Sequence, residues 1–272
     1  MAGVATVGGR RVEFDVSGPV TPGAPVLVFH HGQPGAALIG DDLAAAAAAD
    51  VTAVLDHLGA GEFVTAGWSG GGPHALACGA MLAPRCRAVA TIAGVAPYHG
   101  VDDLDWTAGM GPENVAEFSA LIAGDPAVEG QIAGLCAALE SVADGEVADL
   151  LGGLISPPDR AALEGGAGAL MGAWLRRSAT TGHHGYLDDG RAFVGPWGFD
   201  PTLISVPVQV WMADLDLMVP PSHGRWLASR LPTATAILME GEGHISLGVT
   251  HLGAIVDRLV AAGGLSGGAP PG

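Results

Sequence analysis

A turn of glycines around one serine constrains the fold of this chain more than any other feature. The segment Gly67-Trp68-Ser69-Gly70-Gly71 follows an apolar stretch at 62–66 and precedes a stretch that is predicted to be helical to about residue 82. It fits the pattern G-x-S-x-G at a junction of strand and helix, where small neighbours let a sharp turn lift the serine hydroxyl above the edge of a sheet. Ser69 is therefore the candidate nucleophile, and the backbone N–H of Gly70 is placed to stabilise an oxyanion.

Apolar strand-like stretches alternate with helical ones on both sides of this turn. Gly8-Gly9 separates two short strands and predicts a hairpin. The alternation predicts an α/β fold in which a mostly parallel sheet carries helices on both faces. The expected strands are 3–7, 11–16, 25–29, 62–66, 88–93, 206–212 and 234–239, and the main expected helices outside the insertion are 43–58 and 248–262.

The stretch between residues 94 and 206 contains no convincing strand. It holds four amphipathic helical candidates, at 114–123, 127–142, 146–154 and 160–177, each weakened by glycines. We therefore expect residues 1–95 and 200–263 to form an α/β core, 96–199 a helical lid, and 264–272 a flexible tail.

The charge of the chain excludes several classes of function. Its 28 acidic residues outnumber 11 basic ones, all of them arginine, and the formal net charge is −17. Binding of nucleic acid or of an anionic membrane surface requires clustered cations, so neither partner is expected. The lack of lysine also excludes Schiff-base lysine chemistry and a Walker-type phosphate loop. The expected partner is a small-molecule substrate.

The remaining composition favours a cytoplasmic protein, monomeric or homodimeric. Cys78, Cys86 and Cys136 form no C-x-x-C pair and are expected to be free thiols. The N-terminus lacks the apolar region of a signal peptide, and no window has the character of a membrane span. No cofactor is expected. No metal is expected either, because His183-His184 and His223 lack metal-like spacing.

Two further residues complete a candidate catalytic set. His244, just beyond the last expected strand, is the candidate general base. Asp216, in the loop after the preceding strand, is the candidate acid that holds the imidazole, and Asp214 is the alternative. The three follow the chain order nucleophile, acid, base. The less favoured acid is expected to be a capping or turn residue.

Four motifs together resemble the α/β-hydrolase fold superfamily, in its branch with a serine nucleophile and a helical lid. They are His31-Gly32-Gln33-Pro34-Gly35, Gly67 to Gly72, Asp216 with Val219-Pro220, and Gly243-His244, and they span most of the chain. The resemblance implies that the backbone N–H of Gln33 supplies the second oxyanion donor. Residues 197–201 also resemble small uncharacterised hydrolases of an actinobacterial type.

The chain departs from this family pattern after the oxyanion motif. The family places a further helix and strand between that loop and the helix that precedes the nucleophile strand, and residues 35–50 have no room for them. The expected strand at 25–29, helix at 43–58 and strand at 62–66 still make one crossover. The hairpin must then either pair directly with the strand at 25–29 or leave an open edge there. We expect the first arrangement, a seven-stranded sheet in which the hairpin is shifted over the missing unit, and a wider or distorted pocket.

The resemblance and the motifs favour a serine hydrolase of the carboxylesterase type (EC 3.1.1) that cleaves an ester, thioester or related acyl bond. A serine at position 69 disfavours dehalogenase and epoxide-hydrolase chemistry. Candidate substrate-binding residues are His31, Trp68, Trp106 and Trp197. The lid is poor in charge, and its large apolar residues indicate either an apolar substrate side or a lid core; they are Trp106, Met110, Met171, Trp174, Tyr186 and Trp197.

Three alternatives remain open. The same triad supports carbon–carbon bond hydrolysis, lyase or perhydrolase chemistry. A second class is a non-catalytic protein that binds a ligand on a hydrolase-like scaffold. A third is a truncated or misread gene product that folds poorly, which a cooperative melt would exclude.

Overall fold

The computed structural model describes residues 2–18, 25–34 and 43–265. Five parallel strands form the central sheet in the order β3-β4-β5-β6-β7. The apolar runs of the middle strands are buried on both faces, as parallel strands between two layers of helices require. The strands are β3 (Leu27–His30), β4 (Phe63–Trp68), β5 (Cys86–Ile92), β6 (Val208–Ala213) and β7 (Ala234–Met239).

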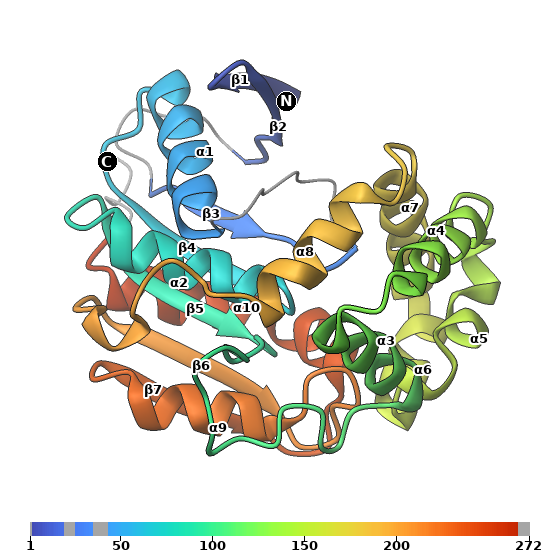
Figure 1. Cartoon of the computed structure of the whole chain (residues 1–272). Helices are drawn as coiled ribbons and strands as arrows, with labels where there is room; N and C mark the ends of the chain where they lie inside the picture. The colour runs from blue at the N-terminus through green and yellow to red at the C-terminus, as the bar shows by residue number, and fades with distance from the viewer. Residues whose placement is uncertain (1, 19–24, 35–42, 266–272) are drawn as a thin grey trace.

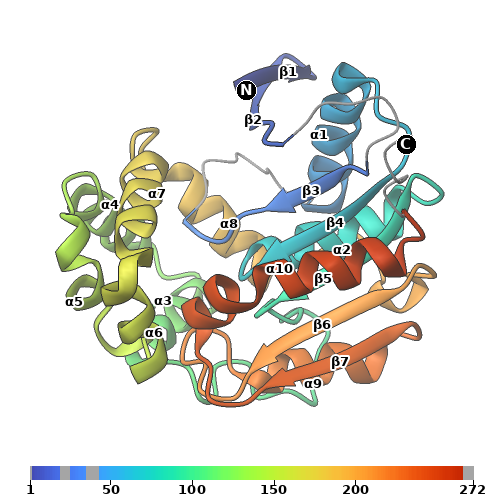
Figure 2. The ribbon, with the colours of Figure 1, turned by 180° about the vertical axis from the view of Figure 1, so that it is seen from behind.

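Helices cover both faces of this sheet (Figures 1 and 2). One face carries α1 (Leu43–Leu58), α2 (Gly71–Met81) and α9 (Pro221–Arg230), and the other carries α10 (His244–Ala262). Each face has its own apolar cluster, and α10 contributes Leu247, Ile255 and Leu259 to the second one. The structure thus confirms the predicted α/β fold class.

The N-terminal hairpin does not join the sheet, which corrects the expectation of seven strands in one sheet. Strands β1 (Ala2–Val7) and β2 (Arg10–Asp15) pair with each other, and no described residue links them to β3. They lie against α1 instead, where Arg10 forms an ion pair with Asp50 at 2.6 Å. Because β3 has four residues, it offers a short edge for pairing.

The connection from β3 to β4 runs through α1, and the two strands are parallel neighbours. This is the single crossover that the sequence predicts. Residues 35–42 lie outside the described residues, so the loss of a helix-strand unit there stays a prediction.

Six helices lie between β5 and β6 in the chain and gather beyond the carboxyl ends of the strands (Figure 1). This helical insertion comprises α3 (Pro112–Ala123), α4 (Ala127–Leu139), α5 (Val147–Leu151), α6 (Pro157–Ala162), α7 (Gly168–Ala179) and α8 (His184–Val194). Short 3-10 or π turns occur at Asp144–Glu146, Gly152–Leu154, Leu163–Ala167 and Pro201–Leu203. The helix expected at 160–177 is broken at Gly166, whose φ of 118° is incompatible with a continuous helix.

Among the described helices, α10 is long and apolar enough to cross a membrane by length and composition alone. A core helix passes the same test. In this fold α10 lies on the sheet, with Ile255 and Leu259 fully buried against it. The three cysteines are buried and unpaired, as expected for free thiols.

Candidate active site

The glycine turn has the geometry that its sequence predicts. Strand β4 ends at Trp68, helix α2 begins at Gly71, and between them Ser69 has a φ of +56°. A non-glycine residue in this region is held there by its surroundings, and such strain concentrates at functional sites. A β-carbon at Gly67 would overlap the carbonyl oxygen of Gly71, and one at Gly71 would overlap the carbonyl oxygen of His30.

Replacing Gly67 by alanine should lower the free energy of unfolding by about 2–3 kcal/mol, because neither backbone segment can move away from the added methyl group. Gly130→Ala is the matched control. A β-carbon there meets open space on α4, so the change should instead stabilise by about 0.5–1 kcal/mol. Urea titration of both variants measures the difference. Equal stabilities would contradict the steric requirement at Gly67.

The candidate base and acid lie in contact. Nδ1 of His244 is 2.8 Å from Oδ2 of Asp216, and both side chains are almost fully buried. The other carboxylate oxygen of Asp216 accepts hydrogen bonds from the backbone N–H groups of Met218 and Val219, each at 2.8 Å. These bonds fix the carboxylate, and the carboxylate fixes the ring orientation. Nε2 of His244 is left to act on the cavity that the ring lines.

The environment of His244 favours its charged form. Burial lowers the pKa of this histidine, but the charge and hydrogen bond of Asp216, together with the charge of Asp159, raise the pKa above its usual value of 6.5. A histidine whose protonated form is stabilised by neighbouring carboxylates is suited to accept a proton from a serine hydroxyl.

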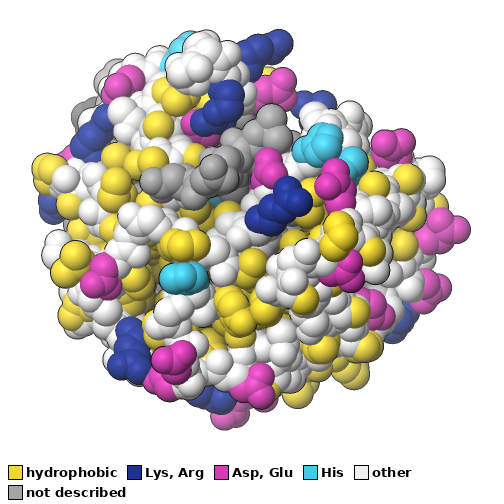
Figure 3. All heavy atoms as spheres, in the orientation of Figure 1, with side chains coloured by type: hydrophobic (Ala, Val, Ile, Leu, Met, Phe, Trp, Pro, Cys, Tyr) yellow, Lys and Arg dark blue, Asp and Glu magenta, His cyan; other side chains and the backbone are white. Residues whose placement is uncertain are grey.

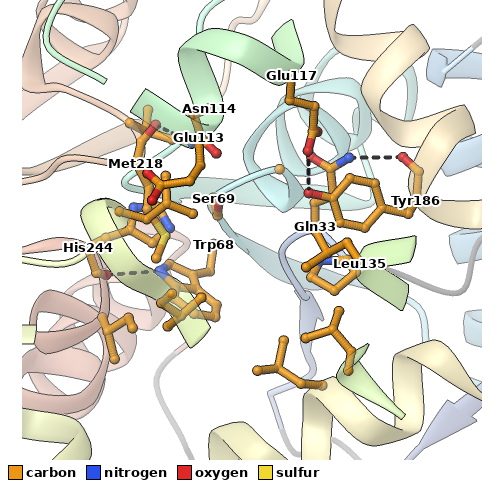
Figure 4. Close-up of a pocket in the computed structure, with 18 of the residues that line it drawn as sticks. Gln33, Trp68, Ser69, Glu113, Asn114, Glu117, Leu135, Tyr186, Met218 and His244 are labelled. Atoms are coloured by element: carbon orange, nitrogen blue, oxygen red, sulfur yellow. Dashed lines mark hydrogen bonds between the residues drawn. The ribbon is translucent and has the colours of Figure 1, made fainter. Parts of the chain in front are cut away.

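Ser69 and His244 line one cavity of about 250 Å³. The structure gives no hydrogen bond between these two described side chains; they face the same cavity. Trp68, also a candidate from the sequence, directly precedes Ser69 in the chain and lines the same cavity beside His244 (Figure 4). Its indole N–H donates to the carbonyl of His244 at 3.2 Å, and its ring centroid is 5.3 Å from the imidazole. Trp68 therefore borders the cavity and holds the histidine.

The two predicted oxyanion donors are on the same side of this cavity. Gln33 and Gly70 both line it, and the backbone nitrogen of Gln33 is 3.4 Å from where a β-carbon of Gly70 would stand. The side chain of Gln33 points elsewhere and donates to the carbonyl of Tyr186 at 2.9 Å. Their role as oxyanion donors stays a prediction.

Asp214 occupies the turn position that the sequence assigns to the less favoured acid. Its side chain is exposed and accepts a hydrogen bond from the backbone N–H of Gly241 at 2.8 Å. His223, the histidine nearest this loop in sequence, is fully buried and bonded to backbone groups of Ala96 and Trp106. Burial lowers the pKa of His223 to about 4, against the opposing effect of the Trp106 carbonyl, so it is a neutral core residue.

Three of the four candidate substrate-binding residues lie outside the cavity. Trp106 is a core residue whose indole N–H donates to the carbonyl of Ala96. Trp197 is likewise buried away from the cavity, and His31 is exposed with its ring 6.4 Å from that of Trp174. Other residues of the insertion line the cavity instead. Those are mainly Leu135, Leu139, Leu150, Leu151, Leu154, Met171, Trp174 and Leu175.

One buried carboxylate that the sequence pattern does not indicate contacts the backbone of the candidate base from the insertion. Asp159 in α6 is fully buried and accepts hydrogen bonds from the backbone N–H groups of His244, Ile245 and Ser246 at 2.7–3.2 Å. It also accepts bonds from the backbone and hydroxyl of Ser156. One carboxylate thus caps its own helix and the N-terminus of α10. The order Ser156-Pro-Pro-Asp159 is a capping-box signal for α6, but nothing local points to α10.

One cluster among the described residues has the donor types of a metal site. Glu129, His183 and His184 offer ligand atoms within 4.8 Å of one another, although the sequence predicts no such grouping. These residues lie in the helical insertion and do not line the cavity. Nε2 of His183 is 3.4 Å from Oε1 of Glu129, so a direct contact between these two side chains already accounts for their closeness.

Comparisons with known proteins bear on the architecture. No protein-family model and no curated protein matches the chain. Solved structures match it over nearly its whole length. An α/β hydrolase fold protein from Nakamurella multipartita is 19% identical, with a TM-score of 0.59 and coverage of 98% of this chain and 100% of that one.

Two further solved structures have similar values. An esterase from Rhodococcus sp. ECU1013 is 18% identical, with a TM-score of 0.63 and coverage of 95% and 99%. A bromoperoxidase from Bacillus anthracis is 17% identical, with a TM-score of 0.62 and coverage of 96% and 99%. Identities this low establish the architecture and not the activity. With its parallel sheet, its serine turn and these neighbours, the chain has the α/β-hydrolase fold.

Proposed function

We propose that the protein is a serine hydrolase that cleaves an ester, thioester or related acyl bond. The observation that carries this proposal is one cavity shared by a serine at positive φ and a histidine whose far nitrogen is bonded to a buried aspartate. The fold-level likeness to an esterase agrees with it. The small and mostly apolar cavity fits a small acyl substrate.

In the proposed reaction Ser69 Oγ attacks the carbonyl carbon while Nε2 of His244 takes the hydroxyl proton. The N–H groups of Gln33 and Gly70 stabilise the oxyanion. The intermediate collapses to an acyl-serine, and His244 returns the proton to the leaving alcohol or thiol. Water then attacks the acyl carbon with His244 again as base, which releases the acid and restores Ser69.

Treatment with a fluorophosphonate probe followed by intact-mass analysis tests this proposal. The expected result is a single adduct on the unmodified chain and none on the Ser69→Ala or His244→Ala variants. Ser229→Ala, at an exposed serine on α9, should label like the parent chain. A well-folded chain that takes up no probe would overturn the proposal and favour the alternative of a ligand-binding protein. If the adduct forms, assays with short 4-nitrophenyl esters test whether the activated serine cleaves esters.

A further inference from the structure

The described charged side chains that line the cavity besides His244 are all acidic. Besides the ionisable His244, the acidic residues that line it are Glu113 and Glu117 of α3, and no arginine lines it among the described residues. The chain has no lysine to offer. Elsewhere many carboxylates face arginines, as Asp50 faces Arg10. Within the part of the chain that the structure describes, neither cavity glutamate faces an arginine.

Glu117 is the more enclosed of the two. Figure 4 shows it beside Tyr186, across the view from His244, with Ser69 between. Its carboxylate accepts a hydrogen bond from Tyr186 Oη at 2.9 Å, and no other described group donates to it. Glu113, by contrast, is exposed and bonded to the backbone N–H of Gly153.

The position of this pair is built rather than accidental. The backbone carbonyl of Tyr186 accepts the side-chain N–H of Gln33 at 2.9 Å, which ties α8 to the loop that also presents the Gln33 backbone nitrogen. Burial raises the pKa of Glu117 to about 7, although the Tyr186 hydroxyl opposes the shift. A part-buried carboxylate with one neutral donor is incompletely compensated, and a cation in the cavity would compensate it.

The field of the whole molecule acts in the same direction. The formal net charge of −17 repels anionic ligands and attracts cationic ones. Acidic side chains are spread over the face in Figure 3 rather than gathered in one patch, so this attraction is general. The net charge draws cations to the molecule as a whole, and Glu117 provides a specific place for one inside the cavity.

Resting on the proposed acyl hydrolysis, we propose that the substrate carries a cationic ammonium group that binds Glu117 while its acyl carbon lies at Ser69. The leucines and methionine of the insertion would contact the carbon chain between these two ends. Glu117 is then a specificity-determining residue, because the bond cleaved is independent of the distant cation.

An isosteric pair of chromogenic esters tests the proposal. The probes are 4-nitrophenyl alkanoates of several chain lengths that end in either a trimethylammonium or a tert-butyl group, which share shape and differ in charge. At the best length the cationic ester should have a kcat/KM at least about tenfold higher, mainly through KM, because the cavity shields the ion pair from solvent. In Glu117→Gln the ratio should fall to about one.

The control is Glu140→Gln, which makes the same change at an exposed glutamate after α4 and should keep the parent ratio. Turnover of both esters with no preference for the cation would overturn the inference and leave the proposed hydrolase intact.

If no ester is cleaved and no probe binds Ser69, the proposed function fails. Butyltrimethylammonium, which is not hydrolysed, then tests the cation site alone. Its binding, followed as a rise in Tm at constant ionic strength, should be present in the parent chain and absent in Glu117→Gln, and its absence from both would overturn the inference.

Discussion

Replacing Asp216 by asparagine should lower kcat for the proposed ester hydrolysis by about ten thousand-fold, as loss of the orienting carboxylate does in serine hydrolases with such a triad. The asparagine oxygen can still accept from the backbone N–H groups of Met218 and Val219, which leaves its amide N–H₂ facing Nδ1 of His244. The ring must then carry its proton on Nε2, where it cannot accept the proton of Ser69. Initial rates with a 4-nitrophenyl ester measure the loss.

Asp214→Asn is the matched control, because the same change falls two residues away on an exposed side chain. Its oxygen can keep the hydrogen bond from Gly241, so turnover should stay within a fewfold of the parent chain. Melting curves show whether both variants are folded. A large loss in Asp214→Asn with little change in Asp216→Asn would transfer the acid role to Asp214.

Replacing Asp159 by alanine should lower the free energy of unfolding by about 3–5 kcal/mol, because a buried hydrogen-bond network loses its acceptor. The carboxylate accepts five hydrogen bonds, two from Ser156 and one each from the backbone of His244, Ile245 and Ser246. Those donors lie where no other acceptor is described, and the N-terminus of α10 also loses a favourable negative charge. Urea denaturation measures the change.

Asp149→Ala, also in the insertion, is the control for this loss. Its carboxylate is exposed and pairs with Arg160, so its removal should cost about 0–1 kcal/mol. Similar stabilities for the two variants would contradict a capping role for Asp159.

The pH profile of Asp159→Asn separates positioning of the base from stability alone. His244 must be neutral to act as a base, so kcat/KM should fall as the pH drops through its raised pKa, above 6.5. Asp216 and Asp159 are the charged groups that raise this pKa. Removing the charge of Asp159 should therefore move the acid limb to lower pH, toward the effect of Asp216 alone. An unmoved limb in a folded variant would contradict the electrostatic role.

The same linkage has a sign for stability. A histidine whose pKa is raised by folding stabilises the native state most when it is protonated. This contribution is complete below the pKa of the unfolded chain, about 6.5, and is lost as the pH rises through the higher pKa of His244 in the fold. Stability near neutral pH and activity thus change in opposite directions with the charge on this ring.

Features encoded by neighbouring residues could be predicted from the sequence. The serine turn needs glycines at 67 and 71, and the hairpin needs residues that tolerate positive φ at Gly8 and Gly9. The strands of the sheet are apolar runs of limited length. The preference for Asp216 over Asp214 agrees with the contact to His244, since Asp216 is the one of the two that the structure places there.

Features that depend on distant contacts could not be predicted. Asp159 and Ile245 are 86 residues apart, and a capping signal says nothing of a second helix. The place of the hairpin depends on contacts with α1, such as the pair of Arg10 and Asp50. Helix α8 begins at His184 and lacks a long apolar stripe, so its sequence pattern is weak. Trp106 and Trp174 both lie between β5 and β6, and tertiary packing puts one in the core and the other in the cavity.

Because Asp159 caps both α6 and α10, the position of His244 depends on the insertion being folded. If α6 opened locally, the first turn of α10 would lose its acceptors, and the histidine that starts this helix would lose its fixed place. A molecule in which α6 is open would then be inactive, because His244 would be misplaced even though Ser69 is uncovered. For protein engineering, the insertion is not a cassette that can be exchanged freely, because any replacement must bring a carboxylate to the N-terminus of α10.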